Sequence, residues 1–197
     1  MTSVQWVKLL EKQHREFNKS VYTVTELMSL SGLKRDYLLV QLSRLVKKGV
    51  LIRYRYGLYG ISECSPEQIV PYLDSSAYCT GQYALFKHGF ITQIPTAITC
   101  FTKRHHCRNR IFSAGSNKYE FFKPMSHIHS CPEFGMASPE QAFCDYIYFC
   151  RNRGLNASSI STFRKLSTLD KKEVERILTV YPKTVHKEVM QFLKIGG

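Results

Sequence analysis

The chain has 197 residues, of which 28 are lysine or arginine and 15 are aspartate or glutamate, so its formal net charge is +13 at pH 7. This surplus indicates a polyanionic partner, and the 44% hydrophobic and 13% aromatic content excludes a disordered basic tail. A membrane helix needs a run of about 18 apolar residues, and the sequence has none. The opening residues also lack the pattern of an export signal, so we expect a cytoplasmic protein without membrane association.

The basic surplus is greatest at the start of the chain, because residues 1–62 hold 11 basic and 4 acidic residues. Residues 63–136 hold 7 and 5, and residues 137–197 hold 10 and 6. A polar stretch that ends at Pro66 predicts a boundary between two domains, 1–62 and 63–197. The seven cysteines lie in or beside apolar runs, which favours reduced core thiols over a disulfide framework.

Helical spacing of apolar residues predicts three helices in the first domain. The first covers residues 4–17. A short second helix has Thr23 or Thr25 as its cap and ends at Gly32, where glycine permits left-handed geometry. The third covers residues 34–48, with an apolar stripe on one side.

A β-hairpin is expected directly after the third helix. Residues 50–55 and 58–61 predict two strands, joined by a turn at residues 56–57. Three helices followed by such a hairpin have the order of a winged helix-turn-helix. Residues 42–53, where the last helix runs through a glycine into the hairpin, resemble bacterial winged-helix regulators.

The third helix is the expected DNA reader, because the major groove admits one α-helix. Its reading residues should project opposite the Leu38, Leu42 and Leu45 stripe. Arg35 and Gln41 are expected to reach base edges, since guanidinium and carboxamide groups pair bidentately with guanine and adenine. A basic helix alone is equally well explained as a solvated surface, and the helix–hairpin order favours DNA. The expected DNA-binding residues are Lys34, Arg35, Tyr37, Gln41, Arg44, Lys47, Lys48, Arg53, Arg55 and Tyr56.

The second domain begins with mixed elements. Residues 77–86 predict a helix that ends at His88-Gly89, and residues 97–102 predict a strand. Alternation over residues 111–122, with a turn in the middle, predicts a small antiparallel sheet. A further extended piece is expected over residues 125–131.

Helices close the second domain. Ser138 is a helix cap, and Gln141 stands where a capping box places it. This helix is expected to run to about residue 153, ahead of a glycine. Helices are also predicted over residues 170–179 and 183–194. The fold class is therefore α+β, a winged helix-turn-helix followed by a mixed α/β C-terminal domain with a small antiparallel sheet and C-terminal helices.

Several short patterns occur together in one order. They are Tyr83–Phe90, Gln93–Pro95, the basic patch after Thr99, and Ala137–Asp145. With the winged helix they cover roughly residues 5–160, and the chain resembles the AbiEi antitoxins of bacterial type IV toxin-antitoxin (abortive infection) systems. The resemblance implies repression of its own operon through promoter DNA with inverted repeats, and a C-terminal domain that counteracts a nucleotidyltransferase-like toxin. A solitary regulator would have the same sequence features.

A second basic patch follows the strand at residues 97–102 and comprises Lys103, Arg104, Arg108 and Arg110. It could be a solvated loop, extend the DNA footprint or grip an acidic toxin surface. Asp145 is expected to pair with this stretch or to face a partner.

Enzymatic readings have weaker support. Glu120 and Lys123 are the nearest acid–base pair to a nuclease motif, but a spacing of three puts them on opposite faces of a strand. His127, His129 and Cys131 alternate and could share a face for zinc, yet no Cys-x-x-Cys pair accompanies them. We therefore expect no catalytic residues, metal or cofactor. A metal-dependent nuclease with a winged-helix targeting domain is the alternative.

Overall fold

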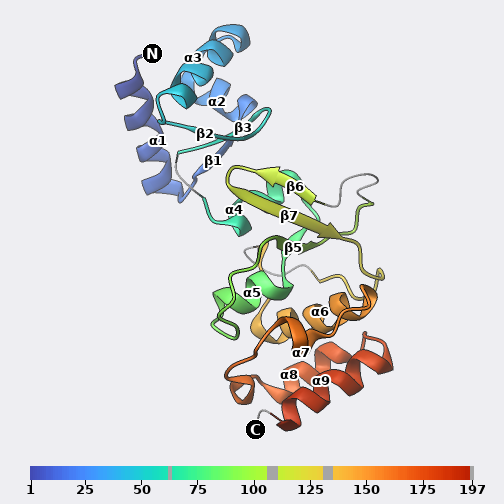
Figure 1. The fold of residues 1–197 in the computed structure, drawn as a ribbon. Helices are drawn as coiled ribbons and strands as arrows, with labels where there is room; N and C mark the ends of the chain where they lie inside the picture. The colour runs from blue at the N-terminus through green and yellow to red at the C-terminus, as the bar shows by residue number, and fades with distance from the viewer. Residues whose placement is uncertain (62–63, 106–110, 131–134, 196–197) are drawn as a thin grey trace.

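A computed structural model describes residues 1–61, 64–105, 111–130 and 135–195. The fold is α+β, with two small sheets between groups of helices. The molecule is elongated, with the first helices at one end, the C-terminal helices at the other and the sheets between them (Figure 1).

The N-terminal part, residues 1–61, has the predicted helices and hairpin in the predicted order. A short additional strand pairs antiparallel with the second hairpin strand, which gives a three-stranded sheet. Thr23 ends this strand and caps the next helix, where Thr23 Oγ1 accepts a hydrogen bond from the Glu26 N–H at 3.3 Å. The elements are α1 (Ser3–Phe17), β1 (Val21–Thr23), α2 (Val24–Ser31), α3 (Arg35–Lys47), β2 (Ile52–Arg55) and β3 (Leu58–Gly60), with sheet order β1-β3-β2.

A buried hydrogen bond joins α1 to α3. The Trp6 indole N–H donates to Gln41 Oε1 at 2.7 Å, and the two residues are 1% and 7% exposed. The prediction that Gln41 reaches base edges is therefore wrong. Gln41 lies beside the Leu38/Leu42/Leu45 stripe, and its carboxamide is buried because it satisfies the indole donor.

The C-terminal part, residues 64–195, contains a mixed sheet of order β4-β5-β7-β6. β6 and β7 form the expected antiparallel hairpin, but β5 runs parallel to β7, which side-chain alternation alone does not predict. The elements are α4 (Pro66–Leu73), β4 (Tyr78–Cys79), α5 (Gly81–Lys87), β5 (Ile98–Phe101), β6 (Ile111–Ala114), β7 (Asn117–Phe122), α6 (Pro139–Asn152), α7 (Ala157–Ile160), the 3₁₀ helix η2 (Leu166–Thr168), α8 (Lys171–Leu178) and α9 (Lys183–Ile195).

Two predicted elements differ in this part. Residues 77–86, expected as one helix, divide into β4 and α5, because β4 gains antiparallel pairing with β5. Residues 125–130 form a turn rather than an extended piece, closed by the Ile128 N–H donating to the Met125 carbonyl at 2.9 Å. Cys131 lies outside the described residues.

Asp145 lies at the centre of the C-terminal part and is fully buried. It accepts hydrogen bonds from Thr80 Oγ1 at 2.6 Å, Tyr181 OH at 2.5 Å, Gln141 Nε2 at 2.9 Å and Tyr78 OH at 3.1 Å. The sequence had suggested that Asp145 pairs with the basic stretch or faces a partner, but its side chain is enclosed in the core, and within the described residues it forms no ion pair with Lys103 or Arg104. The Gln141 side chain thus donates to Asp145 and does not complete the expected capping box, although the Gln141 backbone N–H donates to Ser138 Oγ. Burial raises the pKa of Asp145 to about 6, against the lowering effect of these hydrogen bonds.

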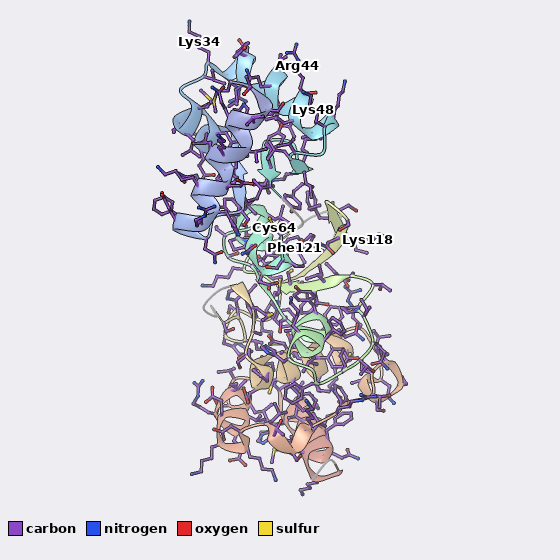
Figure 2. All side chains as sticks on the ribbon, turned by 90° about the vertical axis from the view of Figure 1, so that its left-hand side faces the viewer. Lys34, Arg44, Lys48, Cys64, Lys118 and Phe121 are labelled. Carbon is purple, nitrogen blue, oxygen red and sulfur yellow. The ribbon has the colours of Figure 1, made fainter. Side chains whose placement is uncertain are left out.

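The two parts share a hydrophobic cluster. Tyr54 and Leu58 of the hairpin pack in one cluster with Cys64 and Phe121, both of which lie where the parts meet (Figure 2). The Cys64 N–H donates to the Tyr54 hydroxyl at 2.8 Å. The hairpin is therefore anchored to the C-terminal part. A domain boundary at residue 62 stays a prediction.

The described cysteines confirm the expectation of reduced core thiols. Cys64, Cys79, Cys100, Cys144 and Cys150 are free and buried. Within the same described ranges, no helix has the length and apolar character needed to cross a membrane.

Substitution Gln41→Met tests the hydrogen bond between α1 and α3. Methionine has a similar length but no strong acceptor, so the buried Trp6 N–H loses its partner. We expect the free energy of unfolding to fall by about 2 kcal/mol in urea denaturation. The matched control Arg44→Met, on the exposed side of the same helix, should change it by less than about 0.5 kcal/mol. Equal losses in the two variants would contradict this role of Gln41.

Substitution Asp145→Asn should change how stability depends on pH. The folded-state pKa is raised from 3.8 to about 6, so proton uptake favours the folded protein as pH falls, and this contribution is lost as pH rises through about 6. We therefore compare the free energies of unfolding of the wild type and Asp145→Asn. As the pH is lowered from 7 to 4, the wild type should gain about 2 kcal/mol relative to the variant. Urea denaturation of both proteins at several pH values measures this difference, and parallel pH profiles would contradict the assignment.

Candidate nucleic-acid interface

Helix α3 lies at the end of the molecule remote from the C-terminal helices (Figure 1). Arg44 of this helix, and Lys34 and Lys48 directly before and after it, lie at that end of the molecule (Figure 2). All five basic residues of this segment, here called the α3 cations, are exposed: Lys34, Arg35, Arg44, Lys47 and Lys48.

The α3 cations have few internal partners. Lys48 Nζ donates to Ser3 Oγ at 3.2 Å. In the described part of the chain, none of the five forms an ion pair with a carboxylate. Their positive charge is thus available to an anionic partner.

One side of α3 faces solvent along its whole length, and we call it the outer face. Because an α-helix has 3.6 residues per turn, the positions of the residues on this side place the outer face opposite the buried stripe of α3. Sequence reasoning named only some of its members, because it selected basic, amide and tyrosine side chains and passed over Asp36, Val40 and Ser43. The helical spacing of these three residues, opposite the leucine stripe, was the signal that could have identified them. The outer face comprises Asp36, Tyr37, Val40, Ser43, Arg44 and Lys47.

The outer face carries more than positive charge. Tyr37 and Val40 are 56% and 50% exposed. Asp36 lies in the first turn, where a carboxylate is favoured by the helix dipole. A carboxylate at this position can also accept a hydrogen bond from cytosine N4. The face therefore offers an acidic, an apolar and a basic group to a partner.

The hairpin residues divide between two roles. Arg53 is exposed, and Tyr56 at the turn is 75% exposed. Arg55 is also exposed, but its Nη2 donates to the Tyr72 carbonyl of α4 at 2.7 Å. Arg55 thus fastens the hairpin to the C-terminal part, a contact that local sequence spacing does not predict.

The second basic patch is described only in part. Lys103 and Arg104 are exposed, while Arg108 and Arg110 lie outside the described residues. Arg104 Nε lies 3.7 Å from the carboxylate of Asp74. Asp74 is buried and accepts a hydrogen bond from Thr102 Oγ1 at 2.5 Å, so this carboxylate positions the start of the patch.

The residues considered for catalysis or metal binding have other contacts. Glu120 forms an ion pair with Arg153, and Lys123 is exposed just beyond β7. His129 Nε2 contacts the Ser76 carbonyl oxygen at 2.7 Å. No cluster of three or more His, Cys, Asp or Glu side chains suited to a metal ion occurs among the residues that the structure describes.

No protein-family model and no curated protein matches this chain. Among solved structures, the chain is similar to that of the RV2827C protein from Mycobacterium tuberculosis, with a TM-score of 0.58 and 11% sequence identity. The match covers 98% of this chain and 78% of that one. This likeness shows a common fold.

Proposed function

We propose that the chain is a sequence-specific DNA-binding repressor whose N-terminal part is a winged helix-turn-helix. The observation that carries the proposal is the exposure of the α3 cations at a free end of the molecule (Figure 1), with Arg44 and Lys47 on the outer face of α3. In this reading, α3 enters the major groove of promoter DNA and the β2–β3 hairpin is the wing.

The element order supports this assignment. The α1-β1-α2-α3-β2-β3 order, with its three-stranded sheet, places α3 directly before the β2–β3 hairpin. Arg35 begins α3, and the N-terminal residues of a recognition helix contact base edges. Lys47 lies in the last turn, where it is suited to a phosphate contact.

Two substitutions should weaken DNA binding in different ways. Duplexes enriched from a random library provide the specific site, and fluorescence anisotropy over a salt series measures affinity. Lys47→Ala should weaken specific and scrambled duplexes alike and lower the salt slope by about one unit. Arg35→Ala should instead reduce the preference for the specific duplex by about 1–3 kcal/mol.

A distant lysine provides the control for this experiment. Lys171 is exposed on α8, in the C-terminal part, so Lys171→Ala should leave both affinity and salt slope unchanged. Failure of any duplex to enrich, or equal effects of Lys47→Ala and Lys171→Ala, would overturn the proposal. Metal-dependent cleavage of labelled duplex that is lost in Glu120→Ala would favour the nuclease alternative.

The resemblance to AbiEi antitoxins suggests a second role for the C-terminal part. The motif Tyr83–Phe90 covers most of α5 and the residues directly after it, and the motif Ala137–Asp145 covers the first half of α6. Apolar side chains of both motifs lie in one core cluster. Near the other end of α6, an open groove of about 770 Å³ is lined by Arg151, Lys187 and Glu188 among others. We propose that this part counteracts a nucleotidyltransferase-like toxin.

The two proposed roles should separate by mutation. In cells that express an adjacent nucleotidyltransferase-like gene, the double substitution Arg44→Ala and Lys47→Ala should abolish repression of a promoter reporter. The same variant should still protect growth, because neither residue touches the C-terminal part. Growth arrest with the folded double variant, or no protection by the wild type, would contradict the antitoxin role.

A further inference from the structure

We propose that Val40 recognises the C5 methyl group of a pyrimidine, which in unmodified DNA is that of thymine, near the middle of the sequence read by α3. The inference rests on the proposed DNA-binding function and names a chemical feature that the operator must contain.

Val40 occupies the middle of the outer face. At ~100° per residue, its side chain projects between those of Lys47 and Arg44, with Asp36 and Tyr37 further out on either side. Val40 is 50% exposed, and it lies close to the midpoint of α3 (Arg35–Lys47). If the outer face enters a DNA groove, the Val40 side chain therefore lies close to the base edges at the bottom of that groove.

The fold itself gives no reason for valine at this position. The apolar residues that hold α3 in the core lie on its other side, at Leu38, Leu42 and Leu45. A β-branched residue is a poorer helix former than alanine, lysine or glutamate, which suit an exposed helix position better. An exposed valine at this position is free to contact a partner.

The charges around Val40 determine which partner fits. The α3 cations would repel one another across an interface with a second copy of this chain, whereas they complement the phosphates on both sides of a DNA groove. The thymine methyl is the apolar group on the major-groove edges of unmodified DNA, and the other groups are hydrogen-bond donors and acceptors. Val40 against cytosine or guanine would leave such a group without a partner.

Removal of one methyl group from the DNA tests the inference directly. Each thymine of the duplex enriched for wild-type binding is replaced in turn by deoxyuridine, which differs only in lacking the C5 methyl. At one position, we expect affinity to fall about fourfold, the effect of one buried methyl-sized group. Val40→Ala should bind the thymine and deoxyuridine duplexes equally at that position.

The matched control is Arg44→Ala, on the same face. It should weaken binding to both duplexes while keeping the thymine preference. A second set of duplexes carries cytosine or 5-methylcytosine at the sensitive position. Tighter binding of 5-methylcytosine than of cytosine supports recognition of the methyl group itself, and equal binding of the two overturns it.

The failure of this inference is distinguishable from failure of the proposed function. If no duplex is enriched, DNA binding itself is refuted. If an enriched duplex binds tightly but every deoxyuridine replacement is neutral, or if Val40→Ala keeps the deoxyuridine penalty, DNA binding stands and the role of Val40 is refuted.

Discussion

The rotation of α3 about its own axis determines which residues meet a partner, and the buried hydrogen bond from Trp6 to Gln41 fixes that rotation. Leucine side chains on the same side of α3 could pack with small adjustments, because hydrophobic contact has little directional preference. A hydrogen bond between two buried polar groups is directional, and leaving either group unpaired costs free energy. The polar pair thus selects one arrangement of the outer face from several that burial alone would permit.

The hairpin connects α3 to the rest of the molecule. Tyr54 and Leu58 contribute to a cluster that also contains residues of the C-terminal part, and Arg55 bonds to the α4 backbone. A hairpin without such contacts could move by itself, whereas an anchored hairpin moves with the part that holds it. Any partner that shifts the C-terminal part relative to α3 would therefore also shift the hairpin, which would give such a partner a physical route to alter the proposed DNA binding.

Much of the N-terminal part follows from local sequence, because its helices have clear periodicity, Thr23 caps α2 and the hairpin has a two-residue turn. Gln41 could not be placed in this way. Its spacing puts it at the edge of the buried stripe, and only the indole 35 residues earlier in the chain decides that it is buried. β4 was missed for the same reason, since its partner strand β5 lies about 20 residues further on. Asp145 shows the reverse case, a charged residue whose burial depends on donors distant in the chain, Tyr78 and Thr80 on one side and Tyr181 on the other.

The outer face also has a direction along the helix axis. Asp36, Val40 and Arg44 follow one another at four-residue intervals, so an acid, an apolar group and a cation succeed each other about 6 Å apart, given a rise of about 1.5 Å per residue. This interval is close to two base pairs at about 3.4 Å each. Within this row the carboxylate lies near the N-terminal end and the cation near the C-terminal end, while Lys34 and Arg35 add positive charge beside Asp36. Under the proposed function, reversal of α3 in the groove would exchange the two ends of this row, so the row would distinguish the two orientations of α3 as well as the bases that it contacts.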